Sequence, residues 1–522
     1  MECRKKRGNM NKLVYIKRMA VLLSGLLLCS CSNLPPQTSA PVLPAGANAP
    51  QPLPPLPTPG QYAWHQHELQ IFIHFGPNTF TGKGWGTGQE SPDIFNPSAL
   101  DCEQWARVAK EKGFTRMTMT AKHHDGFCLW PSAFTEHSVK NSKWRDGKGD
   151  VVGEFVKACR KYDLSVGIYL SPWDRHDSRY GTTNYNEYYI NQVNELFDRY
   201  GTIDSFWLDL AGLQRSPMPF EWQAIYDAIY RRNPACTIEM GGPDVGSIGN
   251  ETGVGLESCW NISAVPQREN STGVLPGKLP VGYAGATQPP AEKVGEHPNY
   301  KAIPALRYYP HLGNASVRGG WFWNLGKGRG TNWWLQTYFK SVGRGSSMMY
   351  GFAPDRRGLF PEEDVAGAVA LKQMLDATFK ADFARGKAIA ATNAWKSCDG
   401  YDATKAVDGN PNTYWAADAG DTAGQLEVDF KKTVTFNLIS LREPVFMGQR
   451  VKQYRVEYWD GTTWQLFSEG TTIGYQKLDR RDAISAQKVR LVIENARAYP
   501  LISHFGVYMT PFTAQEINEK KP

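Results

Sequence analysis

Short apolar runs alternate with amphipathic segments along the first half of the chain, and this alternation restricts the possible fold more than any other feature. The apolar runs predict strands at 71–74, 115–121, 165–171, 205–209 and 236–240. Between them, apolar residues recur at positions i, i+3 and i+4, which predicts helices at 99–112, 151–163, 185–200 and 220–232. Strands and helices that alternate in this order form a parallel sheet covered by the helices.

The alternation resumes after residue 320. Residues 243–320 give no clear pattern, but Trp321-Phe322-Trp323 is followed by a predicted helix at 332–342, a strand at 347–353 and a helix at 362–379. These segments would complete eight units near residue 385. We therefore expect an α/β fold, a (β/α)8 TIM-like barrel over residues 61–388, with functional side chains at the carboxyl ends of its strands.

The pattern changes beyond residue 390. Apolar and polar residues alternate with a period of two at 425–430, 454–459 and 488–493, and turn signals such as Asp460-Gly461 separate these segments. Residues 389–514 are therefore expected to form a C-terminal antiparallel β-sandwich.

The N-terminus has the pattern of an export signal. Basic residues precede the apolar run 19–28, which is too short to span a bilayer, and Leu28-Cys29-Ser30-Cys31 is similar to a bacterial lipoprotein cleavage box. We expect residues 1–31 to be a signal peptide ending at the lipidated Cys31, the alternative being an ordinary signal peptide cut nearby. Residues 32–60 contain ten prolines, which predicts a semi-rigid linker.

Charge and cysteine content limit the class of protein. The formal charge is +7, but the first 30 residues hold seven basic side chains against Glu2, so the rest is almost neutral and nucleic acid is not an expected partner. The nine cysteines show no C-x-x-C and no zinc-type spacing, so no disulfide framework is expected, although an oxidising compartment permits one pair. The 17 tryptophans and 24 tyrosines favour sugar binding, because aromatic rings stack on pyranose faces, although many belong to the core.

Two carboxylates are candidates for catalysis of glycoside hydrolysis. Asp209 ends the aromatic strand 205–209, where it is suited to act as a nucleophile; the alternative is a carboxylate that caps the next loop. Hydrolysis with retention needs a second carboxyl group about 5–5.5 Å away as proton donor. Glu251, flanked by Gly249 and Gly253, is the first candidate, and Glu257 and Glu239 compete with it.

Histidines follow the first two predicted strands. His74 ends the first strand, and His123 and His124 end the second, where neutral imidazoles could bind sugar hydroxyls. A metal site at His123, His124 and Asp125 is not expected, because adjacent residues of an extended chain point in opposite directions.

Four motifs in order carry a family resemblance. Residues 71–80 read IFIHFGPNTF, 121–130 AKHHDGFCLW, 167–173 GIYLSPW and 207–209 WLD. Together they resemble glycoside hydrolase family 29, the retaining α-L-fucosidases, and the branch that acts on α-1,3/1,4-linked fucose most closely. The C-terminal segments 406–410, 413–415, 441–443 and 448–451 are similar to discoidin-like (factor 5/8 type C) modules.

The resemblance implies roles for individual residues. Asp209 would be the nucleophile and Glu251 the acid/base. The fucose pocket would be lined by His74, Trp85, His123, His124, Tyr169 and Trp207, and we add Trp321 as a further candidate. Relatives usually carry a Glu where this chain has Gly84, and an Arg-Trp pair where it has Gly246-Ser247, which predicts altered specificity or weak activity on common substrates.

The leading hypothesis is a retaining exo-α-L-fucosidase, lipid-anchored in the bacterial cell envelope, that acts on fucosylated glycans without a cofactor or metal. Two alternatives remain: a non-catalytic glycan-capture lipoprotein, and a retaining glycosidase with shifted specificity, such as an α-L-galactosidase. The sequence does not indicate the oligomeric state.

Overall fold

The computed structural model describes residues 48–213, 218–257, 259–264, 306–397 and 399–512. The predicted signal peptide, the lipidation site Cys31 and the first part of the proline-rich linker lie outside these residues. No helix among the described residues is long and apolar enough to cross a membrane.

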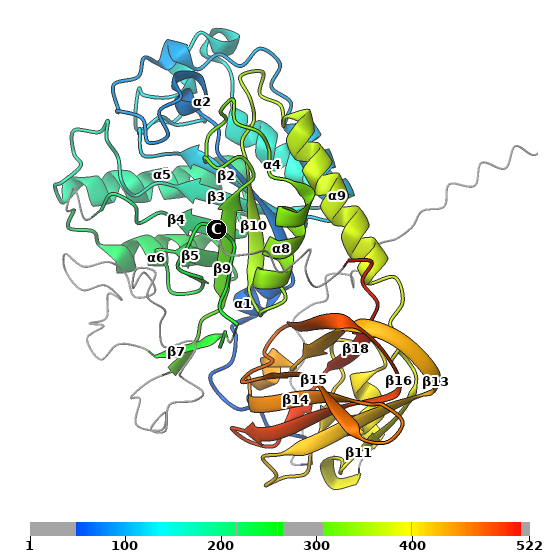
Figure 1. The fold of residues 1–522 in the computed structure, drawn as a ribbon. Helices are drawn as coiled ribbons and strands as arrows, with labels where there is room; N and C mark the ends of the chain where they lie inside the picture. Colours follow the sequence, from blue (N-terminus) through cyan, green and yellow to red (C-terminus); the bar gives the residue numbers. More distant parts are fainter. Residues whose placement is uncertain (1–47, 214–217, 258, 265–305, 398, 513–522) are drawn as a thin grey trace, which may run out of the picture. The chain divides into compact units, whose positions relative to one another are not determined.

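An eight-stranded sheet forms a nearly closed barrel (Figure 1). Its strand order is β5-β4-β3-β2-β1-β10-β9-β6, and every ladder in it is parallel. The strands are β1 Leu69–Ile73, β2 Arg116–Lys122, β3 Ser165–Leu170, β4 Ser205–Leu208, β5 Thr237–Met240, β6 Gly246–Ser247, β9 His311–Ser316 and β10 Ser347–Phe352. A parallel bridge between Glu239 and Val245 brings β5 next to the start of β6. The predicted TIM-like barrel is thus confirmed.

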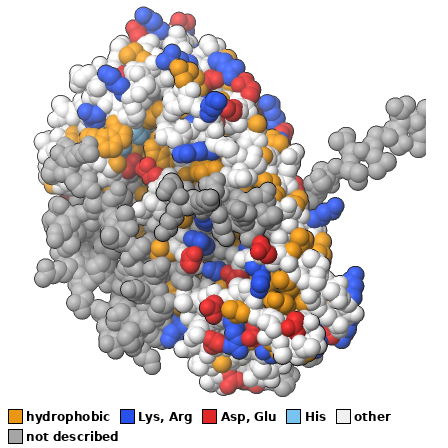
Figure 2. All heavy atoms as spheres, in the orientation of Figure 1, with side chains coloured by type: hydrophobic (Ala, Val, Ile, Leu, Met, Phe, Trp, Pro, Cys, Tyr) orange, Lys and Arg blue, Asp and Glu red, His pale blue; other side chains and the backbone are white. Residues whose placement is uncertain are grey.

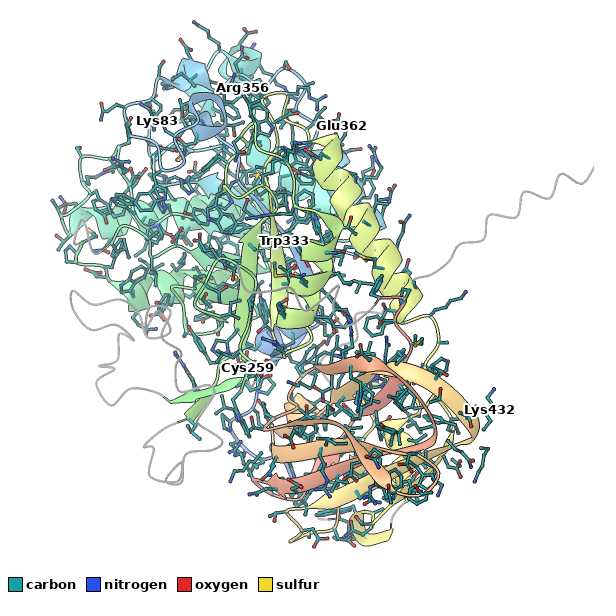
Figure 3. The ribbon with its side chains drawn as sticks, in the orientation of Figure 1. Lys83, Cys259, Trp333, Arg356, Glu362 and Lys432 are labelled. Carbon is teal, nitrogen blue, oxygen red and sulfur yellow. The ribbon has the colours of Figure 1, made fainter. Side chains whose placement is uncertain are left out.

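The helices mostly cover the outside of the sheet, whereas the first of them places Trp64 among the side chains inside the barrel. They are α1 Pro59–His65, α2 Pro77–Thr81, α3 Cys102–Glu111, α4 Val151–Lys161, α5 Asn184–Tyr200, α6 Trp222–Arg232, α8 Thr331–Ser341 and α9 Glu362–Thr378. Figure 3 marks Trp333 on α8 and Glu362 at the start of α9. Asp101 and Asp150 begin α3 and α4, because each carboxylate accepts a hydrogen bond from a backbone N–H of the first turn.

The segment without a clear sequence pattern contains two of the barrel strands. β6 is only two residues long, and β9 carries the polar residues His311, Asn314 and Ser316 although it is buried throughout. Polar side chains are unusual in a buried strand, so hydrophobic periodicity did not reveal β9. Strands β7 Ile262–Ala264 and β8 Leu306–Tyr308 form a separate antiparallel pair.

The C-terminal region is antiparallel, as predicted. Its main sheet has the order β11-β13-β16-β14-β15, with β18 paired to β13, and β12 pairs with β17. The strands are β11 Ala388–Ala391, β12 Trp415–Ala416, β13 Gly424–Arg442, β14 Val451–Trp459, β15 Trp464–Gly470, β16 Lys477–Ala496, β17 Leu501–Ile502 and β18 His504–Tyr508. Alternate residues of β13, among them Leu426, Val428 and Phe430, are buried, as a sheet with one face on a core requires.

The described cysteines are buried. Cys102, Cys128, Cys159 and Cys236 are free, and thiols in such positions act as small apolar side chains. Cys259 Sγ lies 3.7 Å from His311 Nδ1.

Candidate active site

Asp209 lies directly after β4 and is held by three neighbours. The Tyr169 hydroxyl donates to Asp209 Oδ2 at 2.9 Å, and the Ala211 backbone N–H donates to Oδ1 at 2.8 Å. His124 Nε2 lies 3.5 Å from Oδ2. The Asp209 side chain is 18% exposed, so a carboxylate oriented by hydrogen bonds still reaches solvent.

Glu251 follows β6, and its loop is tied to β9 by a bridge between Thr252 and Ala315. The Trp321 indole N–H donates to Glu251 Oε2 at 3.1 Å. Partial burial raises the pKa of the Glu251 carboxyl, the Trp321 hydrogen bond opposes this, and the negative charge of Asp209 raises the pKa further. The charge of Asp209 thus reaches the Glu251 carboxyl at the end of the barrel.

The competing carboxylates lie elsewhere. Glu239 is fully buried inside the barrel, 3.2 Å from Arg116 Nη1, and accepts from Trp64 Nε1 at 3.1 Å. Glu257 is 88% exposed, and its carboxylate lies 3.5 Å from Arg344 Nη2. Neither has a described contact with Asp209, whereas Glu251 does interact with it.

Aromatic rings surround the two carboxylates. Tyr169 stacks on Trp207 with ring centroids 5.2 Å apart and on His123 at 5.5 Å. Trp321 stacks on His74 at 5.0 Å. Phe72 meets Trp207 and Trp321 with ring centroids 4.9 and 5.7 Å apart, so these rings form one connected cluster. The cluster contacts Asp209 through Tyr169 and Glu251 through Trp321, and an aromatic surface of this kind suits a sugar whose C6 is a methyl group.

The three histidines of the site are held neutral. Burial lowers the pKa of His74 to about 3 and that of His123 well below its ordinary value, and each is lowered further by neighbouring imidazoles. Burial also lowers the pKa of His124, although the charge of Asp209 opposes this. Neutral imidazoles can donate through one nitrogen and accept through the other, as binding of sugar hydroxyls requires. No group of three or more His, Cys, Asp or Glu side chains among the described residues could hold a metal ion.

Trp85 and Trp173 form the rim. Trp85 is 39% exposed and meets His124 and Trp173 edge to face, with centroids 5.9 and 5.5 Å away. Trp173 belongs to the motif at 167–173 but is not among the site residues predicted from the sequence. Its ring lies 5.0 Å from that of His124. Trp173 follows the third predicted strand, as His74 follows the first, and this position could have identified it as a site residue from the sequence.

A buried ion pair anchors the loop that carries Trp173. Lys122 Nζ lies 3.1 Å from Asp174 Oδ2 and also donates to Tyr185 Oη and Gln192 Oε1. Both charged side chains are almost completely buried, and the ammonium group lies over three tyrosine rings of α5. Nothing in the sequence pattern indicated this pair.

Gly84 and Gly246, where the family resemblance predicts departures, differ in the space around them. A side chain at Gly84 would extend into open space, whereas one at Gly246 would collide with the ring of Tyr309.

Figure 3 shows Lys83 and Arg356 at the same end of the barrel, and Arg356 donates to the Phe80 carbonyl at 3.2 Å.

Surface charge is mixed on the face shown in Figure 2. Among the coloured side chains of that face, basic and acidic groups are interspersed, and hydrophobic side chains gather beside a histidine on the barrel.

The barrel and the C-terminal sandwich each match a known protein family. The model of the alpha-L-fucosidase family matches residues 64–240, and that of the F5/8 type C domain matches residues 388–505. The chain is 35% identical to alpha-L-fucosidase 1 of Arabidopsis thaliana over 481 residues, 90% of this chain and 91% of the relative.

Solved structures extend the similarity. A glycoside hydrolase 29 family member from an unknown rumen bacterium has a TM-score of 0.71 and 32% identity, covering 90% of this chain and 81% of its own. A Ruminococcus gnavus GH29 fucosidase in complex with fucose has a TM-score of 0.80 and 28% identity, covering 91% and 98%.

Proposed function

Because the chain belongs to the α-L-fucosidase family, we propose that this hydrolase removes terminal α-L-fucosyl residues with retention of configuration, through a covalent intermediate on Asp209. The observation that carries the proposal is the position of Asp209: a partly exposed carboxylate at the end of β4, oriented by the Tyr169 hydroxyl and the Ala211 N–H. A nucleophile must be fixed in direction, and the two donated hydrogen bonds orient the Asp209 carboxylate.

Glu251 acts in this proposal as acid and then as base. In the first step its proton passes to the glycosidic oxygen as Asp209 attacks C1, the bond to the leaving group breaks, and the fucosyl group is bound to Asp209. In the second step Glu251 takes a proton from water, which attacks C1 and releases Asp209. The raised pKa of Glu251 keeps a larger fraction protonated near neutral pH, as a proton donor needs.

The pocket residues select the sugar. Neutral His74, His123 and His124 bind hydroxyls, and the stacked rings of Tyr169, Trp207 and Trp321 face the apolar part of fucose. We further propose α-1,3/1,4-linked fucose of glycans as substrate, on the resemblance of the four strand-end motifs to that branch of the family.

One comparison of substrates tests the proposal. Purified protein should hydrolyse aryl α-L-fucoside and a branched α-1,3/1,4-fucosylated trisaccharide, and should be much less active on aryl α-L-galactoside, because the extra 6-hydroxyl would meet the aromatic wall. Faster hydrolysis of the galactoside would overturn the sugar assignment. Hydrolysis of the aryl fucoside but not of the trisaccharide would overturn only the linkage.

A further inference from the structure

A short part of the proline-rich segment is hydrogen-bonded to one end of the C-terminal sandwich. The Trp395 indole donates to the Asn48 carbonyl at 2.7 Å, and Arg497 Nη2 donates to the Pro54 carbonyl at 3.0 Å. Between these points Gln51 and Leu53 are also bound. The segment 48–55 is thus fixed along its length by residues from three loops of the sandwich.

The bonds use the few groups that a proline-rich chain offers. Proline has no N–H, so Gln51 and Leu53, each between two prolines, are the donors in the stretch from Pro50 to Pro55. Both are used: the Gln51 N–H donates to the Tyr499 hydroxyl at 2.7 Å, and the Leu53 N–H donates to the Met447 carbonyl at 2.9 Å. A proline-rich chain otherwise offers carbonyl oxygens, and these face arginine and tryptophan donors.

The sandwich side of this contact is built from buried groups. Arg450 is fully buried, its guanidinium lies 4.5 Å from the centre of the Tyr499 ring, and Nη2 donates to the Gln51 carbonyl at 2.7 Å. The Tyr499 hydroxyl donates to the same carbonyl at 3.0 Å, and its ring lies 4.7 Å from that of Trp395. Gly448 has no room for a Cβ, because the Leu53 carbonyl occupies that position.

We propose that this end of the sandwich is a binding seat for a proline-rich peptide, and that its occupant is residues 48–55 of the same chain. The seat consists of Trp395, Met447, Arg450, Arg497 and Tyr499. It recognises its occupant by hydrogen bonds to the backbone of an extended proline-rich chain, mainly from side-chain donors to its carbonyl oxygens. Because the chain's own segment fills it, the seat is closed to other ligands. Residues 48–55 of the predicted linker 32–60 therefore belong with the folded sandwich and do not act as a free spacer.

Substitutions in the segment test this without altering the sandwich. Gln51→Pro with Leu53→Pro in the full-length protein removes both backbone donors while the segment stays proline-rich. Leu56→Pro is the matched control, because the structure gives the Leu56 N–H no hydrogen bond. Hydrogen exchange of residues 445–450 and 496–499 is measured by mass spectrometry, together with binding of a labelled peptide of residues 46–58.

The double variant should exchange about tenfold faster in both seat segments than the wild type and the control, since two hydrogen bonds are lost. The added peptide should bind the double variant and not the wild type, and should restore slow exchange. Activity on aryl α-L-fucoside should be unchanged in all three proteins. Unchanged exchange in the double variant, equal binding of the peptide to the wild type, or protection of the wild-type seat by an added sugar would each overturn the proposal.

Discussion

Trp321 has two contacts that make it more than a wall of the pocket. Its indole N–H is bonded to Glu251, and its ring stacks on His74. The hydrogen bond stabilises the ionised form of Glu251 and so lowers the pKa of that carboxyl. Trp321 thus lowers the pKa of the proposed proton donor and also forms part of the sugar pocket.

Trp321→Phe should therefore change the pH profile in a defined direction. Loss of the indole N–H raises the pKa of Glu251, the acid stays protonated to higher pH, and the basic limb of kcat/KM moves upward. Profiles on aryl α-L-fucoside for wild type and variant measure the shift. Trp333→Phe on α8 is the control, because Trp333 has no described bond to Glu251. A basic limb that moves downward would contradict the role of the hydrogen bond.

The loss of rate caused by Glu251→Ala should depend on the leaving group of the substrate. A dinitrophenyl fucoside needs little protonation and should lose little rate in the bond-breaking step, whereas a fucosylated trisaccharide should slow by about 10²–10⁴-fold. Glu257→Ala is the matched control, since that carboxylate is exposed and paired with Arg344. If the control shows the dependence on leaving group and Glu251→Ala does not, the donor is misassigned.

At the scale of elements, the strands that the sequence predicted are those whose apolar pattern is continuous. β1 to β5 and β10 were found within a few residues, because each is a buried run bounded by turn residues. β6 and β9 were not predicted. β6 has only two residues, and β9 places polar side chains inward.

The sequence predicted those site residues whose positions are set by the barrel strands. The residues after β1, β2, β3 and β4 meet because parallel strands end at one rim, so His74, His123, His124 and Asp209 come together. Contacts of Glu251 with Trp321, and of Trp85 with Trp173, depend on loop conformations, for which sequence periodicity carries no information.

Breaking the Lys122–Asp174 pair should destabilise the barrel. Lys122→Met leaves a buried carboxylate without its cation, which typically costs about 3–5 kcal/mol and should lower the melting temperature by roughly 5–10 °C. Lys110→Met is the matched control: its pair with Asp163 is exposed, so the expected change is small. Thermal melting followed by circular dichroism gives both values, and equal effects in the two variants would contradict a stabilising role of the buried pair.

At the scale of the whole molecule, the chain joins a fucosidase barrel to an F5/8 type C domain. The sequence before residue 48 adds an expected lipid anchor on Cys31, in an export signal of lipoprotein type. Such an anchor would keep the hydrolase at the surface of a membrane, where acyl chains supply the affinity.

Cys31→Ala should release the protein from the membrane or leave it unprocessed. Acylation needs the thiol, and the described residues contain no membrane-spanning helix that could replace the anchor. Fractionation of expressing cells, with Cys29→Ala as control, measures this outcome. A processed Cys31→Ala protein that stays in the membrane pellet would mean that another element anchors it.

We expect Asp209 to carry the fucosyl group during the reaction, and mass spectrometry of a trapped intermediate provides the sharpest test. A 2-deoxy-2-fluoro fucosyl fluoride should form the covalent intermediate but hydrolyse slowly, because fluorine at C2 destabilises the oxocarbenium-like transition state. After digestion, the account predicts one peptide carrying the added sugar mass, with the modification on Asp209. Turnover of the reagent with no adduct, or an adduct on another carboxylate, would contradict it.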